Sequence, residues 1–211
     1  QMASEMMTGV SETVLINDDV AVEDSSFTTG RRGVAATVIV EKIVGSLAET
    51  GGSLKECKIL GDKVNRNSGS MGVAFSSCTV PAAGNPTFKL GPDEMEFGVG
   101  IHGEPGRRRD KVQPAQEITN ELLGAIIEDL KLENNGEILL FVNGMGGTPL
   151  TELYLLYDNA KKTLDNKNIK IARSLVGNYC TSLEMQGASL TITKLDQELK
   201  KHWDSPVHTA A

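Results

Sequence analysis

Cysteines, aromatic residues and basic charge are scarce in this sequence of 211 residues. Its three cysteines are an odd number with no closely spaced pair, which argues against a disulfide framework and favours reduced thiols. Aromatic residues make up 4% of the chain, so few rings are available to stack on nucleic-acid bases. The net charge of -7 disfavours broad binding to phosphate backbones. We therefore expect no nucleic-acid partner.

Long apolar runs and metal-ligand patterns are also lacking. No run approaches the roughly 20 apolar residues that a membrane span needs, and residues 1–11 lack the basic start and apolar core of a secretory signal. The three histidines do not have the spacing of metal ligands. These features predict no membrane partner, no cofactor or metal in this chain, and a cytoplasmic location. Because the chain opens without Met inside a helix-like pattern, we expect it to be a piece of a longer protein.

Apolar periodicity predicts alternating helices and strands, which is typical of the α/β or α+β class. The expected helices cover residues 31–49, 54–65, 115–132, 149–164 and a short segment that ends at Trp203. The expected strands cover residues 12–16, 71–80, 94–101, 137–142, 169–176 and 189–195. The small polar stretch at residues 67–70 is interpreted as a linker.

Two glycine-rich segments follow predicted strands. Residues 98–103 match the spacing of a dinucleotide fingerprint, but residues 104–106 predict a turn where that fingerprint requires a helix. Residues 144–149 lie between a strand and a helix, a geometry that can hold an anion, yet they lack the Lys-Ser/Thr ending of a P-loop. A structural tight turn is the favoured interpretation of this second segment.

His102 is the main candidate for chemistry. It follows the end of a predicted strand, where α/β proteins place ligands, and nearby glycines leave backbone room around it. A structural role stays open, because the sequence assigns it no acid or base partner. For the adjacent Asp18 and Asp19, a turn or helix-capping role is favoured over an acid–base pair, because neighbours on an extended strand point to opposite faces. His202 and His208 lie in polar contexts and are interpreted as non-catalytic.

Six segments carry a resemblance to a known family and occur in the family's order along nearly the whole chain. They are residues 29–35 (TGRRGVA), 78–84 (CTVPAAG), 94–106 (EMEFGVGIHGEPG), 148–154 (TPLTELY), 178–185 (NYCTSLEM) and 203–208 (WDSPVH). Together they resemble the dihydroxyacetone-binding unit of dihydroxyacetone (glycerone) kinases. The resemblance implies a two-lobed α/β unit whose first lobe is incomplete here. Residues 1–68 would be the C-terminal part of the first lobe, and residues 69–211 the second lobe, which carries the substrate histidine.

The resemblance also implies a chemistry. His102 would add its neutral imidazole nitrogen to the ketone carbon of dihydroxyacetone and hold it as a hemiaminal for phosphorylation to dihydroxyacetone phosphate. Glycerol has no carbonyl, so it would not be captured. The general base is expected upstream of Gln1. ATP or ADP with Mg²⁺ is expected on a nucleotide-binding kinase subunit or fused domain. The donor stays open between ATP and a phosphoenolpyruvate-driven relay, and a homodimer is expected.

Two alternatives stay open. The first is a dihydroxyacetone-sensing transcriptional coactivator, which would bind the ketone through the same histidine and phosphorylate nothing. The second is a lipid- or small-carbonyl-binding protein on a related fold, which would leave His102 and the six segments unexplained. For the kinase interpretation, this chain by itself is expected to be inactive. The basic run at residues 107–109 is expected to be a loop near the site that either docks a partner or is merely solvated.

Overall fold

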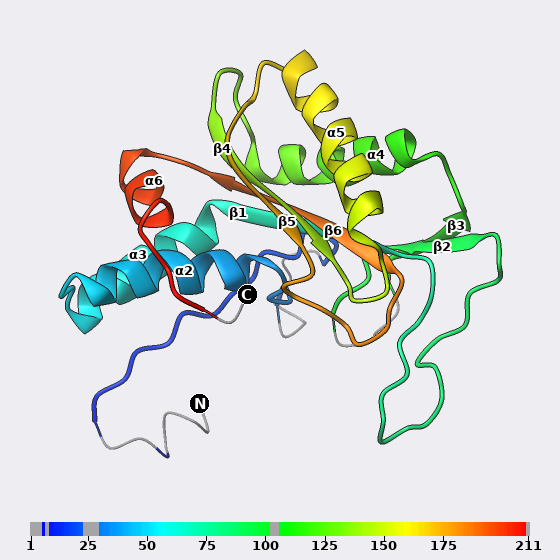
Figure 1. Ribbon diagram of the computed structural model, residues 1–211, viewed down its shortest axis with the longest axis horizontal. Coiled ribbons are helices and arrows are strands. Elements are labelled where there is room, and N and C mark those ends of the chain that lie inside the picture. Colours follow the sequence, from blue (N-terminus) through cyan, green and yellow to red (C-terminus); the bar gives the residue numbers. More distant parts are fainter. Residues whose placement is uncertain (1–5, 7–8, 23–29, 102–105, 210–211) are drawn as a thin grey trace.

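The computed structural model describes residues 6, 9–22, 30–101 and 106–209, and there it forms one six-stranded sheet covered by helices. The strands are β1 (Ser68–Ala74), β2 (Glu94–Phe97), β3 (Arg108–Lys111), β4 (Glu137–Gly144), β5 (Lys170–Gly177) and β6 (Gly187–Lys194). The helices are α2 (Ala36–Glu49), α3 (Leu54–Arg66), α4 (Ala115–Leu130), α5 (Leu150–Asn166) and α6 (Gln197–Trp203). Figure 1 shows α4 and α5 on one face of the sheet and α2, α3 and α6 on the other. The predicted α/β class is confirmed.

The strand order β3-β2-β1-β6-β4-β5 places β1, β6 and β4 in the middle of the sheet. β6 runs antiparallel to both β1 and β4, whereas β4 and β5 are parallel. β2 pairs antiparallel with the end of β1 and carries β3 on its outer side. The edge strands are therefore β3 and β5.

Strand β4 explains why the sheet has helices on both faces. Its residues Ile138 to Val142 are apolar and fully buried. Ile138, Leu140 and Val142 pack in the cluster that includes α4 and α5, while Leu139 and Phe141 pack in the cluster that includes α2, α3 and α6. A strand buried on both faces has a continuous apolar run in place of an apolar–polar alternation, as this sequence does.

The helix predictions agree with the structure to within a few residues, apart from the start of α2. Ser53 caps α3: its hydroxyl accepts from the Glu56 amide at 3.3 Å, and the Glu56 carboxylate accepts from the Ser53 amide at 2.8 Å. Helix α2 begins at Ala36, five residues after the predicted start. None of the described helices is long and apolar enough to cross a membrane.

Three predictions for extended and connecting segments were wrong. Residues 12–16 form no strand, although Val14 and Ile16 pack against the cluster around α2 and α3. The stretch 67–70, predicted as a linker, contains the start of β1. The run at 107–109, predicted as a loop, leads into β3, whose charged side chains are tolerated because β3 is an edge strand.

The division at residue 68 stays a prediction. The described part of residues 1–68 contributes α2 and α3. These helices pack against Leu139 and Phe141 of β4, which lies in residues 69–211. This face of the sheet also receives α6, through Leu199 and Trp203.

Candidate functional site

One edge of β1 is where separate segments of the chain meet. Near its start, the Ser70 amide donates to the Asp18 carbonyl at 2.7 Å, and the Val20 amide donates to the Ser70 carbonyl at 2.9 Å. Further along, the Gly98 amide donates to the Gly72 carbonyl at 2.7 Å. We call residues 18–21, Arg32, residues 70–72 and Gly98 the junction. Its residue Gly98 follows the end of β2, within the predicted histidine segment at residues 94–106.

Asp18 connects the junction to α2. Its carboxylate oxygens accept from the Val34 amide at 2.8 Å and the Ala36 amide at 2.9 Å, and the Ser70 hydroxyl also donates to it. Burial raises the pKa of the Asp18 carboxyl, against the opposing effect of these hydrogen bonds. These bonds to amides at the start of α2 confirm the helix-capping role predicted for Asp18. Ala35, the residue before the helix, makes no side-chain cap of its own.

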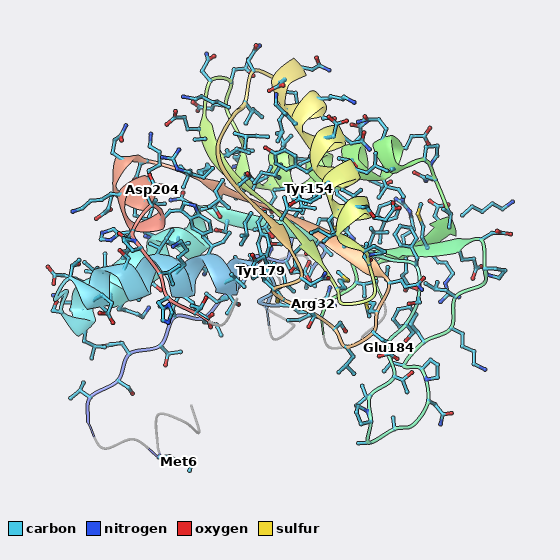
Figure 2. All side chains as sticks on the ribbon, in the orientation of Figure 1. Met6, Arg32, Tyr154, Tyr179, Glu184 and Asp204 are labelled. Carbon is cyan, nitrogen blue, oxygen red and sulfur yellow. The ribbon has the colours of Figure 1, made fainter. Side chains whose placement is uncertain are left out.

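Asp19 and Arg32 connect the junction to Gly98. The Asp19 carboxylate accepts from Arg32 Nε and pairs with Nη2, both at 2.7 Å, and Nη2 also donates to the Gly98 carbonyl at 2.8 Å. The Asp19 side chain is 3% exposed and that of Arg32 is 23% exposed. Arg32 is labelled in Figure 2. Burial raises the pKa of Asp19, and the Arg32 charge opposes that rise. One guanidinium thus holds two segments that are far apart in the sequence.

Residues 98–106, here called the histidine loop, are anchored at both ends. Gly98 has φ 75°, and a Cβ there would lie 2.7 Å from the Ala21 side chain, so only glycine fits this position. At the other end, the Arg107 amide donates to the Phe97 carbonyl at 2.7 Å, and a Cβ on Gly106 would lie 2.2 Å from that carbonyl oxygen. His102 itself lies outside the described residues, so its role stays a prediction.

A second ion pair holds the far end of the histidine loop. The Glu96 side chain, 7% exposed, accepts from the Gly106 amide at 2.9 Å and from Arg109 Nη2 at 3.1 Å. Arg108 bonds to Glu121 at 2.6 Å. Arg108 and Arg109 are therefore paired within the chain, and a docking role for the basic run stays a prediction.

The second glycine segment, residues 144–148, is a structural turn, as predicted; we call it the glycine loop. Its amides at Met145 and Gly147 donate to the carbonyls of Gly187 and Met185, at 3.0 and 2.8 Å. The Gly146 amide donates to Asn178 Oδ1 at 3.2 Å. Because these three amides bond within the protein, they are not available to hold an anion.

Two polar residues, Asn143 just before this turn and Thr148 at its end, were given no individual role from the sequence. Asn143, fully buried, accepts from the Tyr179 and Cys180 amides at 3.1 and 2.9 Å and donates to the Cys180 carbonyl at 2.8 Å. The Thr148 hydroxyl donates to the Gly187 carbonyl at 2.7 Å and accepts from its amide at 2.9 Å. Burial raises the pKa of the Cys180 thiol to about 11. These bonds link the glycine loop firmly to residues 177–187.

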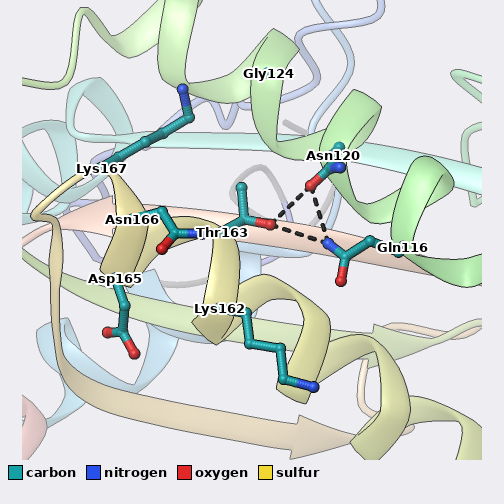
Figure 3. A pocket seen from close by; sticks show the side chains of 8 residues that line it. All are labelled: Gln116, Asn120, Gly124, Lys162, Thr163, Asp165, Asn166 and Lys167. Carbon is teal, nitrogen blue, oxygen red and sulfur yellow. Dashed lines mark hydrogen bonds between the residues drawn. The ribbon is translucent and has the colours of Figure 1, made fainter.

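Other polar clusters offer less chemistry. A groove of about 940 Å³ lies between α4 and α5, where Thr163 and Gln116 donate to Asn120 Oδ1 at 2.7 and 3.0 Å (Figure 3). Its lining includes no residue of the junction. His202 is buried and bonds to Ser46 at 3.0 Å, which joins α6 to α2. Within the described ranges, no three His, Cys, Asp or Glu side chains are grouped to hold a metal.

Comparisons with known proteins identify the class to which this fold and junction belong. The whole chain, residues 1–211, matches the Dak1 domain. It is 50% identical over 187 residues to the dihydroxyacetone-binding subunit DhaK of a PTS-dependent dihydroxyacetone kinase from Listeria innocua, a match that covers 89% of this chain and 57% of that relative. It is 43% identical over 223 residues to the same subunit of the PEP-dependent kinase from Escherichia coli, covering 94% and 63%. The chain therefore belongs to the Dak1-domain family, and it spans less than two thirds of the length of these relatives.

Solved structures agree with this assignment. A dihydroxyacetone kinase operon co-activator, Dha-DhaQ, aligns with a TM-score of 0.84 at 32% identity, covering 92% of this chain and 60% of that one. The dihydroxyacetone kinase of C. freundii in complex with AMP-PNP and Mg²⁺ aligns with a TM-score of 0.74 at 28% identity, covering 90% and 34%. A fatty-acid-binding protein of Thermotoga maritima, with a TM-score of 0.53 at 11% identity over 80% and 60% of the two chains, shares the fold alone. The predicted resemblance to dihydroxyacetone kinases is confirmed.

Proposed function

We propose that this chain is part of a subunit that binds dihydroxyacetone covalently through His102 and presents it for phosphorylation. The observation that supports this most is the anchored histidine loop. The loop carries the family's histidine segment, and hydrogen bonds fix the backbone on both sides of it. Loops that carry chemistry work best when a rigid scaffold positions them.

The proposed capture step is an addition to the carbonyl. A lone pair on one imidazole nitrogen of His102 forms a bond to the ketone carbon, and the carbonyl π pair moves to the oxygen. The proton on the other ring nitrogen leaves to solvent, and the oxygen takes up a proton, so the product is a neutral hemiaminal. Because the triose has only six heavy atoms, a covalent bond adds affinity that noncovalent contacts cannot supply. Glycerol lacks the carbonyl and is rejected by this step.

The remaining parts of the reaction belong to partners. The relatives' names include PTS-dependent and PEP-dependent kinases, which favours a phosphoenolpyruvate-driven relay as the phosphoryl source. The nucleotide and Mg²⁺ would sit on a partner subunit or a fused domain, as the AMP-PNP and Mg²⁺ complex of the C. freundii kinase suggests. The same proposal includes a general base upstream of Gln1, a homodimeric state and a cytoplasmic location. Sedimentation of the complete protein tests the dimer.

The capture step is tested with dihydroxyacetone labelled with ¹³C at its ketone carbon. The protein encoded by the complete reading frame is expected to convert the ketone resonance to that of a tetrahedral carbon, and His102→Ala is expected to abolish the signal. His208→Ala is the matched control, because His208 is exposed and lies outside the junction. A protein-bound tetrahedral signal that persists in His102→Ala, distinct from that of the hydrate of the free ketone, would overturn the proposal.

A coactivator remains the second candidate, and the alignment with Dha-DhaQ is the observation that favours it. Both functions use the same capture step, so only turnover separates them. The complete protein is mixed with a nucleotide-binding subunit, Mg²⁺ and a phosphoryl donor, and triose phosphate is measured in a coupled assay. Formation of triose phosphate supports the kinase. Capture of the triose without turnover supports the coactivator.

A further inference from the structure

The histidine loop leaves the sheet at Gly98. Two charged side chains help to fix the position of that residue. Arg32 donates to the Gly98 carbonyl at 2.8 Å, and Asp19 holds the same guanidinium through bonds of 2.7 Å. Asp19 is itself fixed, since its amide donates to the Arg32 carbonyl at 3.1 Å and its second oxygen accepts from the Ala21 amide at 3.0 Å. The arrangement has little freedom, because Asp19 is almost fully buried.

Gly98 transmits this position to the residues that follow. Its amide is bonded to Gly72 of β1, and its positive φ turns the chain away from the line of β2. Any shift of the Gly98 carbonyl therefore changes the direction in which the loop departs. His102 follows four positions later in the sequence.

Addition of an imidazole to a ketone is sensitive to such shifts. The reacting atoms must approach to about 3–3.5 Å with aligned orbitals, and a displacement of about 1 Å can cost about 10²-fold in rate. An ion pair that only stabilises the fold would have no such effect on the chemistry of the molecules that remain folded.

We propose that Asp19 and Arg32 are positioning residues that hold the Gly98 end of the histidine loop in the geometry required for carbonyl capture. The inference rests on the proposed function of His102 and adds two residues that act through Gly98. Arg32 contacts the backbone of the loop, Asp19 holds Arg32, and neither takes a direct part in the bond that forms.

The chain supplies a matched control in the neighbouring arginine. Arg31 also pairs with an aspartate, since its Nη1 donates to Asp129 at 2.9 Å, and its side chain is 23% exposed, as is that of Arg32. Its partner lies on α4 and not at the junction. Arg31→Met and Arg32→Met therefore remove arginines of equal exposure, although Asp129 is 24% exposed and Asp19 is 3% exposed. Only Arg32→Met releases the Gly98 carbonyl.

The experiment measures triose affinity, the ¹³C signal of the adduct and the melting temperature for the complete protein and its variants. We expect Arg32→Met to weaken dihydroxyacetone binding by about 10- to 100-fold and to reduce the adduct signal. We expect Arg31→Met to lower the melting temperature by less than Arg32→Met, because Asp129 stays partly solvated whereas Asp19 is buried, and to leave affinity within about twofold. Arg32→Lys is expected to lie between, because an ammonium keeps the charge but cannot form the forked contact.

Each outcome has one meaning. If His102→Ala loses the adduct while Arg32→Met keeps wild-type affinity, the positioning role is wrong and the proposed function stands. If His102→Ala keeps the adduct, the proposed function fails and this inference fails with it. Should Arg32→Met not fold, Asp19→Asn and Arg32→Lys decide the question, because the amide keeps the shape of the carboxylate and the ammonium keeps the charge of the guanidinium. Wild-type affinity in both of these would overturn the proposal.

Discussion

The histidine loop and the glycine loop both follow a strand and both need glycine, yet their backbones are used differently. In the glycine loop, three successive amides and the Thr148 hydroxyl are bonded to residues 178–187. In the described part of the histidine loop, hydrogen bonds anchor Gly98 at one end and Gly106 with Arg107 at the other. The polar groups of the glycine loop are bonded within the protein and serve the fold. The two anchored ends of the histidine loop can instead position a side chain for chemistry.

The largest expected effect tests whether an anchored histidine loop is enough for turnover. We predict that the 211-residue chain is slower than the complete subunit by about 10⁴-fold or more, since a base and substrate positioning each contribute about 10²-fold. The measurement is a coupled assay of triose phosphate with the nucleotide partner, donor and Mg²⁺. Turnover within tenfold of the complete subunit would show that the catalytic base lies within this chain.

The next effect separates fold from chemistry in the glycine loop. Gly146→Ala is predicted to cost more than about 3 kcal/mol of stability, because Gly146 has φ 116° and a Cβ would lie 1.9 Å from the Leu183 carbonyl oxygen. Chemical denaturation measures the loss. Gly124→Ala is the control. It has open space on α4, so it is expected to be neutral or slightly stabilising. An equal effect of the two changes would contradict this account of the loop.

A smaller effect tests the hydrogen bonds of the same loop. Thr148→Val keeps the shape of the side chain and removes a hydroxyl that bonds twice to Gly187, so we predict a loss of about 1–3 kcal/mol. Thr151→Val, at an exposed position in the first turn of α5, is expected to change stability by less than about 0.5 kcal/mol. If the triose affinity of folded Thr148→Val fell as well, the separation between the two loops would be lost.

The smallest effect concerns the thiol beside the glycine loop. Cys180 has its pKa raised to about 11 from 9.0, so at pH 8 its thiolate is roughly 100-fold scarcer than that of an unperturbed thiol. The higher basicity of the thiolate offsets part of this, which leaves labelling by iodoacetamide about tenfold slower. Mass spectrometry of Cys180 peptides from folded and urea-unfolded protein gives the ratio. Equal rates in the two states would show that the thiol is not shielded by burial.

Local patterns in the sequence predicted the elements with strong apolar periodicity. The apolar run around Leu139 and Phe141 predicted a strand, and the apolar spacing of residues 54–65 predicted α3. The start of β1 was missed because Ser68 and Ser70 look like a linker. Their hydroxyls are satisfied by Thr193 and Thr191 across the sheet, and these partners lie 125 and 121 residues away.

The residues of the candidate site were also only partly predictable from local sequence. The segment around His102 could be recognised from its motif, and the capping role of Asp18 from its type. The contact from Arg32 to Gly98 spans 66 residues, and nothing in the spacing of either segment indicates it. Such a contact depends on how β1, β2 and residues 18–21 come together, which is a property of the tertiary fold.

The central strand pair also has a consequence for how the protein is made. Residues 68–74 pair with residues 187–193, so β1 emerges from the ribosome well before β6 exists. Until then β1 and β4 lack the strand that lies between them, and their unpaired backbone N–H and C=O groups stay open to wrong partners. Sheets closed by such distant segments fold slowly. We therefore expect nascent chains that stop before residue 187 to depend on chaperones, and the core to form in one late cooperative step.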